Sequence, residues 1–369
     1  MNRRNFQTFF DCGLSKVRAG TFNTNNSDEA FYAESEFFTD RLNLELKIQK
    51  IVTSLEKNSN EYIDNINLMI DSPKMLSVSI SLSKNLDGSI LKKTNIQFLV
   101  QEAKQQILKY YTNHNIAHII INNYKVDGVD YSYLPDEIKC NLISLDIFFI
   151  CLPTDLVLYL KNIFSKSNIL VDQILCSSYA KSINYKNNLN STGYVSFIDV
   201  GFNKTSIISY LNEKILSFDV LSIGGNHITK DISKILEIDL DTAEQIKLNF
   251  DQNYKLSNKT NISIETLQEI ILARAEEILE LCSQFLNSNL RHLRKIKIEL
   301  MGGGLKIIDN QYKDMISFSS DIDFAEETLK EICLSGFKFV GELNKQEVVI
   351  VPKKQIKQGF FEKLFHFFS

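Results

Sequence analysis

The chain has 369 residues, 44% hydrophobic and 23% charged, an ordinary globular composition that suits two domains or one large bilobed domain. The net charge of -4 argues against nucleic acid as a partner, because such proteins carry a basic field. The six cysteines include no C-x-x-C pair, so we expect a reducing compartment and neither a disulfide framework nor a zinc site. The most apolar stretch, 142–160, is interrupted by Asp146, Pro153 and Asp155 and predicts buried elements rather than a membrane span.

In chain order, the first half predicts alternating strands and helices. A strand at 6–10, a tight turn at 11–15 and a returning strand at 16–22 precede a helix at 42–56. Strands follow at 62–70 and 75–82, and Thr94 is the expected N-cap of a helix that ends near Tyr111. Further strands are expected at 117–122, 143–151 and 169–176, with a helix at 155–166 capped by Thr154.

The polar segment 181–192 predicts a loop and the main boundary between two halves. Strands at 194–200 and 205–210 then flank a second turn, and Asp241 with Glu244 predicts a capping box for a helix ending at 250. A polar loop at 251–260, a long amphipathic helix from 263 to about 293 and a strand at 295–301 complete this half. The alternation predicts an α/β class, with sheets covered by helices.

One local pattern occurs twice, once at the start of each half. An apolar strand ends in Asp-x-Gly and is followed by a turn that carries basic or hydroxyl groups; the copies contain Asp11, Gly13, Ser15 and Lys16, and Asp199, Gly201, Lys204 and Thr205. Glycine lets backbone N–H groups approach a phosphate closely, and hydroxyl and ammonium groups add donors. The two aspartates are candidate Mg²⁺ ligands, acting through water. Taken singly, each copy is equally an ordinary hairpin turn.

Two further features belong to the same pattern. Gly302, Gly303 and Gly304 follow a strand and would let a planar base or ribose lie against bare backbone. Glu244 and Lys247 share one helix face, where they either hydrogen-bond a ribose or form an exposed ion pair; considered alone, the exposed pair is favoured. No Ser-His-Asp arrangement is visible, and no catalytic residue is assigned.

The four features in this order resemble the superfamily of actin, sugar kinases and heat-shock ATPases. Within it, the chain resembles the bacterial cell-division protein family FtsA. The resemblance lies in L-S-I-G-G-N-H-I-T-K-D-I at 221–232, which contains Gly225, in A-E-Q-I-K at 243–247, and in the segments 171–175 and 177–180.

The resemblance implies a bilobed actin-like ATPase fold whose mixed sheets are covered by helices, with ATP and Mg²⁺ between the halves 1–192 and 193–351. It also implies a small inserted subdomain, called 1C, at about 73–161 and a 2B-like subdomain at about 226–293. Phe202 and Asn203 replace two glycines of the family's usual D-I-G-G-G-T turn. We therefore expect ATP binding, with hydrolysis weak or absent.

The segment 352–369 joins a lysine-bearing linker to an amphipathic sequence. On a helical wheel the apolar side chains share an arc of roughly 160°; they are Phe360, Phe361, Leu364, Phe365, Phe367 and Phe368. Such a helix either lies in the interface of an anionic membrane or docks on the protein itself. The FtsA resemblance implies the membrane.

By the same resemblance, the protein is expected to self-associate into filaments and to tether the tubulin-like protein FtsZ at the division site. It would lie on the cytoplasmic face of the inner membrane, as a peripheral protein among other division proteins. Two alternatives remain, a PilM-type scaffold for pilus or secretion assembly and a small-molecule kinase of the same superfamily.

Overall fold

The computed structural model describes residues 6–26, 28–38, 43–135, 138–189, 193–249, 264–289, 296–305, 322–325 and 327–342. Their strands form three sheets. The first has the order β3 (Ala30–Glu34), β2 (Val17–Asn23), β1 (Phe6–Cys12), β4 (Asn65–Ile70), β9 (Leu170–Cys176). The second has the order β12 (Lys214–Leu221), β11 (Thr205–Leu211), β10 (Tyr194–Val200), β13 (Lys297–Met301), β14 (Ile322–Phe324). The third has the order β5 (Leu76–Ile90), β8 (Lys139–Pro153), β6 (His114–Val126), β7 (Val129–Tyr131).

The first two sheets repeat one topology. In the first, β1 pairs antiparallel with β2 and parallel with β4, and in the second, β10 pairs antiparallel with β11 and parallel with β13. The hairpins also close alike, with Cys12 opposite Val17 and Val200 opposite Thr205. The two Asp-x-Gly turns therefore occupy equivalent positions in two related halves. The expected α/β fold with helix-covered sheets is confirmed.

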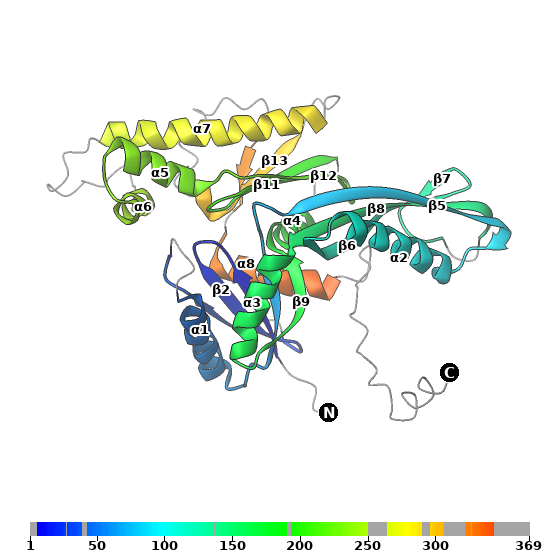
Figure 1. Cartoon of the computed structure of the whole chain (residues 1–369), viewed down its shortest axis with the longest axis horizontal. Coiled ribbons are helices and arrows are strands. Elements are labelled where there is room, and N and C mark those ends of the chain that lie inside the picture. The colour runs from blue at the N-terminus through cyan, green and yellow to red at the C-terminus, as the bar shows by residue number, and fades with distance from the viewer. Residues whose placement is uncertain are drawn as a thin grey trace.

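Each sheet buries its apolar face under its own helices (Figure 1). Helices α1 (Leu44–Ser59), α3 (Thr154–Lys166) and α8 (Leu329–Glu342) pack around the first sheet. Helices α5 (Gly225–Ile235), α6 (Leu240–Leu248) and α7 (Ile264–Asn289) lie together beside the second, and α2 (Lys93–Tyr110) covers the third. Although α8 follows the second sheet in sequence, its Phe337 ring stacks on Phe22 of β2, with centroids 4.7 Å apart. The chain thus returns to the first sheet.

Helix α4 (Ser177–Asn188) connects the two related sheets, and it corrects one sequence expectation. The segment 181–192 was expected to be a loop because it is polar, but residues up to Asn188 are helical. Its polar side chains are buried because they hydrogen-bond across the molecule: Ser182 pairs with Tyr210 at 2.7 Å, and Asn184 donates to Ser335 at 3.1 Å. These polar residues of α4 therefore form contacts between segments of the two halves and are not exposed to solvent.

Smaller corrections concern helix starts. The N-cap of α6 is Asp239, whose carboxylate accepts from the Thr242 amide at 2.8 Å, so Asp241 lies within the helix. Helix α2 starts at Lys93, two residues ahead of the start expected from a Thr94 N-cap, and α3 starts at Thr154, one residue ahead of the expected start. The expected loop at 251–260 and the terminal segment 352–369 lie outside the described residues.

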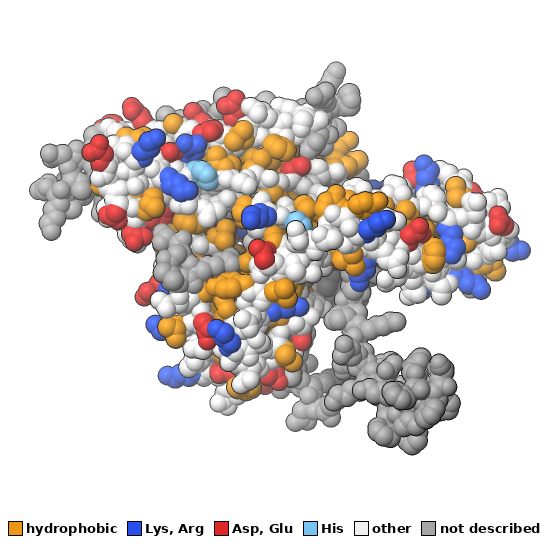
Figure 2. Space-filling model, viewed as in Figure 1, with side chains coloured by type: hydrophobic (Ala, Val, Ile, Leu, Met, Phe, Trp, Pro, Cys, Tyr) orange, Lys and Arg blue, Asp and Glu red, His pale blue; other side chains and the backbone are white. Residues whose placement is uncertain are grey.

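The third sheet, built from residues between β4 and α3, projects from the body and contacts the edge of the second sheet (Figure 1). The Asn122 side chain makes two bonds to the backbone of Ile215 in β12, donating to its carbonyl at 2.8 Å and accepting from its amide at 3.2 Å. Ser77 of β5 donates to the Phe218 carbonyl at 2.8 Å. Figure 2 shows basic, acidic and apolar side chains interspersed over the visible face of this projection and the body.

Candidate functional site

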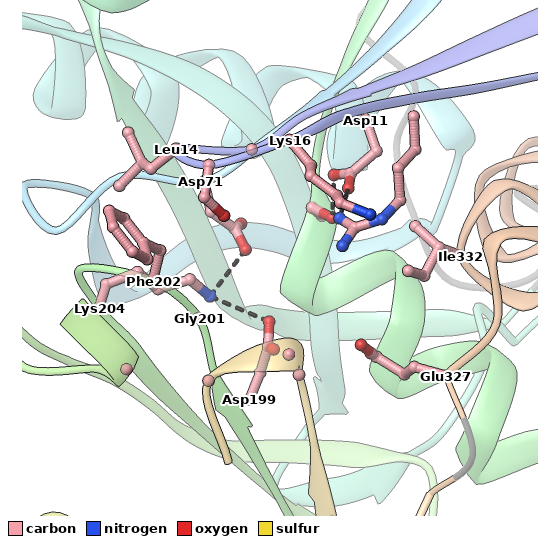
Figure 3. A pocket seen from close by; sticks show the side chains of 18 of the residues that line it. Asp11, Leu14, Lys16, Asp71, Asp199, Gly201, Phe202, Lys204, Glu327 and Ile332 are labelled. Carbon is pink, nitrogen blue, oxygen red and sulfur yellow. Dashed lines mark hydrogen bonds and ion pairs between the residues drawn. The ribbon is translucent and has the colours of Figure 1, made fainter. Parts of the chain in front are cut away.

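The two Asp-x-Gly turns face one another across a cavity of about 250 Å³ (Figure 3). Both turns, the glycines that follow β13 and the second half of α6 contribute to its lining. The lining residues from the first half are Asp11, Gly13, Leu14, Ser15, Lys16, Arg18, Phe37, Asp71, Ser177 and Lys181. Those from later in the chain are Asp199, Gly201, Phe202, Lys204, Gly225, Glu244, Lys247, Leu248, Gly302, Gly303, Gly304, Glu327 and Ile332.

In the first turn, Asp11 ends β1 and is already engaged. It accepts from the Ser177 hydroxyl at 2.8 Å and pairs with the Arg18 guanidinium at 3.3 Å. Lys16 bridges to Glu34 at 2.9 Å in a partly exposed pair, so its ammonium can exchange partners at little cost. A Cβ at Gly13 would meet the Lys16 carbonyl at 2.9 Å, which explains why the turn needs glycine.

At the centre, two lysines hold three carboxylates. The Lys204 ammonium lies between Asp71, at 2.7 Å, and Asp199, at 3.0 Å, as the dashed lines of Figure 3 mark. The Lys181 ammonium lies between Asp199, at 3.0 Å, and Glu327, at 2.8 Å. All five side chains are nearly inaccessible to solvent, apart from a small exposed fraction of Asp71.

Hydroxyl groups complete this network. Ser178 of α4 donates to Asp199 at 2.6 Å and lies within hydrogen-bond reach of Asp71 and Lys204, while Ser206 accepts from Lys204 at 2.8 Å. The network therefore joins β4, α4, β10 and β11, with Glu327 ahead of α8. Charged groups at this depth are stable only when each has its partner.

The ionisation of the network follows from these partners. Burial alone would raise the pKa of Asp71 and Asp199, but the ammonium groups of Lys204 and Lys181 hold both pKa values below the usual range. Burial would lower the pKa of the two lysines, but the carboxylates around them raise it, strongly so for Lys181. The carboxylates are thus ionised and the lysines protonated at neutral pH.

The floor of the cavity is made by backbones in close contact. A Cβ on Gly304 would lie 2.5 Å from the Gly201 carbonyl, and one on Gly225 would lie 2.8 Å from the Gly304 Cα. Gly302 has φ +98° and would collide with Val200. Gly303 is different, because a Cβ there meets nothing within 4 Å. Three of these glycines therefore allow strand-to-turn packing, and Gly303 alone leaves open space.

Glu244 and Lys247 correct a second expectation. They do form an ion pair, at 2.6 Å, but their side chains are only 2% and 5% exposed, so the exposed pair favoured from sequence is wrong. Lys247 also donates to the Gly225 carbonyl at 3.0 Å and the Thr229 hydroxyl at 2.7 Å. The pair is buried because α6 packs on α5 with this face. Burial lowers the pKa of Lys247, although Glu244 opposes this.

Phe202, one of the residues in place of glycine, reaches across the cavity. Its ring packs edge-on against Phe37 from the first half, with centroids 5.5 Å apart, and the Lys247 ammonium lies 5.8 Å from its centroid. The Asn203 side-chain oxygen accepts a hydrogen bond from the side-chain amide of Asn226 at 2.8 Å. Phe202 therefore narrows the cavity and joins its two walls.

The cavity brings together every nucleotide-site residue expected from sequence except Thr205. That hydroxyl donates to the Ile223 carbonyl at 2.7 Å and does not line the cavity. Sequence reasoning missed Asp71, Ser177, Lys181 and Glu327 as site residues. Asp71 carried a usable signal, since it directly follows a strand parallel to β1. Lys181 and Glu327 carried none, because each lies in a segment that reads as polar surface.

The residues that line the cavity indicate which ligands fit it. Glycine backbone at the floor, with Lys16 and Arg18 near the first turn, suits a phosphate-bearing ligand. A divalent cation fits poorly, because the carboxylates at both expected Mg²⁺ positions already pair with Arg18, Lys181 or Lys204. Within the described ranges, no cluster of three or more His, Cys, Asp or Glu is placed to hold a metal ion. None of the helices in those ranges has both the length and the apolar character to cross a bilayer.

Solved structures of similar shape establish the class. The chain matches the PilM–PilN type IV pilus biogenesis complex with a TM-score of 0.64 at 11% identity, covering 89% of this chain and 96% of that one. It matches the ethanolamine utilization protein EutJ from Carboxydothermus hydrogenoformans with a TM-score of 0.51 at 8% identity, covering 90% and 89%. Two related sheets around a shared cavity, with these neighbours, define an α/β protein of the actin-like ATPase fold.

Sequence comparison narrows the class further. Residues 196–326 match the family model of cell division protein FtsA. The FtsA of Buchnera aphidicola subsp. Schizaphis graminum is 25% identical over 232 residues, which cover 57% of this chain and 54% of the relative. The FtsA of Streptococcus pneumoniae serotype 2 is 27% identical over 151 residues, covering 40% and 32%. The expected resemblance to FtsA is confirmed, and the chain spans about half the length, or less, of these relatives.

Proposed function

We propose that this chain is an ATP-binding cell-division protein of the FtsA type, which self-associates and tethers the tubulin-like protein FtsZ to the membrane. The observation that carries the proposal is the cavity between two equivalent hairpin turns, the second of which falls within the FtsA match at 196–326. A cavity walled by both halves makes ligand binding and the relation between the halves interdependent.

The proposed nucleotide lies with its phosphates between the two turns, where Gly13, Ser15, Lys16, Gly201 and Lys204 supply donors or room. Its base and ribose lie toward Gly302 to Gly304, with Glu244 and Lys247 at the far wall. Phe202 limits how closely the second turn approaches the phosphates. We therefore do not expect the phosphates to be positioned tightly enough for efficient hydrolysis. ATP acts here as a ligand that stabilises one arrangement of the halves.

Lys16 supplies the direct test of nucleotide binding. Among the described residues its ammonium bridges to Glu34, in a partly exposed pair, so it is available to a phosphate. A Lys16→Ala variant should bind ATP about tenfold more weakly by calorimetry, because a charge-assisted contact is lost. Lys166→Ala, which breaks an exposed pair with Glu45 away from the cavity, is the matched control. Equal affinity of the two variants would count against this placement.

The segments 1–192 and 193–351 are proposed as the two actin-like lobes, with α8 returning from the second segment to pack on the first lobe. The projecting third sheet, within 73–161, is proposed as the 1C-type subdomain, and 226–293, with α5, α6 and α7, as the 2B-type subdomain that contacts FtsZ. Filaments would present many such surfaces in a row. Co-pelleting with FtsZ tests this assignment. The intact chain is compared with a variant in which the charges of Lys230 and Lys234 are reversed, to disrupt the surface within 226–293 that is proposed to contact FtsZ.

The membrane contact is proposed for 352–369. A single short amphipathic helix binds weakly, and filament formation would make the attachment firm through avidity. Co-sedimentation with anionic liposomes should retain the intact chain and release one ending at Val351. Phe365→Glu, on the apolar arc, should also release the chain, whereas His366→Glu, on the polar face, should bind far better. If truncation changes nothing, the helix does not anchor the protein.

A PilM-type assembly scaffold is the second candidate, favoured by the similarity in shape to the PilM–PilN complex. The amphipathic terminal segment favours the first candidate, because the proposed tethering role needs a membrane contact. A small-molecule kinase ranks lower, because each described carboxylate in the cavity lining is paired with a cation and is a poor general base. A screen that detects phosphoryl transfer to a small molecule would reverse this order.

A further inference from the structure

The acidic side chains that line the cavity all have a basic partner. Asp11 pairs with Arg18, Glu244 with Lys247, and Glu327 with Lys181. Asp71 and Asp199 share Lys204, and Asp199 also pairs with Lys181. Among the described residues of the lining, five are acidic and five are basic, so their formal charges cancel. A triphosphate entering it meets no net repulsion, even without a metal ion to neutralise it.

The position of Lys204 is the decisive feature. Its ammonium has oxygen neighbours on several sides: Asp71 at 2.7 Å, Asp199 at 3.0 Å, Ser206 at 2.8 Å, and Ser178. Two carboxylates and two hydroxyls around one point form an oxygen-rich set of the kind that hard divalent cations select. A lysine carried on the second turn fills that set, and Figure 3 shows its side chain pointing into the gap between the two aspartates.

Displacing this lysine would be costly. A divalent cation at this point would need the Lys204 ammonium to leave both carboxylates, and the surroundings give it no second acidic partner, because Glu327 already pairs with Lys181. Buried ions that lose a partner are strongly destabilised. Asp199 is held from two sides, by Lys181 at one oxygen and Lys204 at the other, so neither oxygen is free to take a proton.

We propose that Lys204, supported by Lys181, takes the place of the divalent cation, so that the described carboxylates of the cavity are not metal ligands and the protein binds its nucleotide independently of Mg²⁺. The nucleotide part rests on the proposed ATP site, whereas the metal part does not. In such a site the carboxylates are neutralised by lysine side chains of the protein itself, whether or not a nucleotide is bound. It suits a nucleotide that is bound and kept as a structural ligand rather than turned over.

The first experiment uses Mn²⁺ alone, without nucleotide, as the probe. The intact wild-type chain should bind no Mn²⁺ in the cavity by calorimetry. Lys204→Met should gain one site and show an Mn²⁺-dependent rise in Tm of about 3 °C, because the freed carboxylates become ligands. Lys166→Met, which removes a lysine from an exposed pair on α3, should gain neither.

Two results would overturn the metal part. One is a wild-type chain that binds one Mn²⁺ and loses it on Asp199→Asn; the other is a folded Lys204→Met chain that binds none. Because the wild-type measurement stands alone, the proposal stays testable even if Lys204→Met does not fold.

The second experiment compares ATP affinity of the wild-type chain in Mg²⁺ and in EDTA. The two dissociation constants should agree within about threefold. A weakening of about tenfold or more in EDTA would overturn the metal-independent site. If ATP binds in neither condition, the proposed nucleotide site fails, while the Mn²⁺ measurements still decide the role of Lys204.

Discussion

At the scale of single residues, the cavity depends on charges that solvent cannot screen. Lys181 connects Asp199 of the second sheet to Glu327 ahead of α8, so one side chain links two distant segments of the chain. This group of three buried ions adds little net stability, because moving them out of water costs about as much free energy as their mutual attraction returns. Removing the Lys181 ammonium is strongly destabilising, because its carboxylate partners then lose a buried counter-charge.

Lys181→Met should therefore lower the free energy of unfolding by about 3–5 kcal/mol, because Glu327 loses its ammonium partner and Asp199 loses one of two. Urea unfolding of the intact chain measures this. Lys166→Met removes a lysine from a solvent-exposed pair and should leave the urea midpoint almost unchanged. Similar midpoints for the two variants would contradict the role given to Lys181.

The same charges set the pH dependence of stability. The pKa values of Asp71 and Asp199 lie below their ordinary 3.8 in the folded protein. Their contribution is therefore complete above pH 3.8, and it is lost as the pH falls further, because the unfolded chain takes up protons first. The raised pKa values of Lys181 and Lys204 act at the other end: their contribution is complete below 10.5 and is lost at higher pH.

Urea unfolding in buffers from neutrality to below pH 3.8 should show this acid loss, and the double variant Asp71→Asn/Lys204→Met should show less of it. The double variant removes one shifted carboxylate together with the cation that shifts it. Identical acid profiles for the two proteins would exclude a contribution from this pair.

At the scale of elements, the glycine run 302–304 that follows β13 is held against the second turn by direct backbone contact. Sequence reasoning assigned all three glycines to the nucleotide. The structure divides them: Gly302 and Gly304 fit against Val200 and Gly201, and only Gly303 faces open space. The run is thus a packing device as well as a candidate binding surface.

Gly304→Ala should destabilise the chain by about 1–3 kcal/mol, because its Cβ forces two backbones apart. Gly303→Ala is the matched control, with the same chemical change one residue away and no atom within 4 Å of the added carbon. Urea unfolding of both variants separates the two roles. Equal losses would mean that backbone flexibility, not packing against Gly201, explains the requirement for glycine.

Helix α4 shows at the same scale why the pattern of polar residues misled. A surface helix is expected to show an apolar stripe, yet α4 buries Ser178, Lys181, Ser182 and Asn184. Each of these finds a partner on a segment that is remote in sequence, such as Asp199, Tyr210 or Ser335. Periodicity cannot identify such a helix, because the partners are supplied only by the fold.

At the scale of the whole molecule, the projecting third sheet is fastened to the edge of the second. Asn122 imitates a neighbouring strand by donating to the Ile215 carbonyl and accepting from its amide. The third sheet, which belongs to the first half in sequence, is therefore attached to the second half through β12.

Asn122→Ala should speed the hydrogen exchange of the Ile215 amide and cost about 1–3 kcal/mol, because a buried backbone donor and acceptor lose their partner. Hydrogen exchange read at that amide is the measurement. Ser83→Ala, which removes a hydrogen bond to Ser144 within the projection, should leave Ile215 unchanged. Unchanged exchange in Asn122→Ala would show that other contacts carry the attachment.

The sequence by itself determined the fold class, most strands and the two equivalent turns, because apolar periodicity and Asp-x-Gly turns are local signals. It also indicated the FtsA resemblance and nearly all of the cavity residues that lie in or beside those turns. Only the tertiary structure decided the roles of Asp71, Lys181 and Glu327, the burial of Glu244 and Lys247, and the helical state of α4. The physical reason is the same in each case: a charged or polar side chain is buried or exposed according to the partner that meets it, and those partners lie up to 166 positions away in the chain.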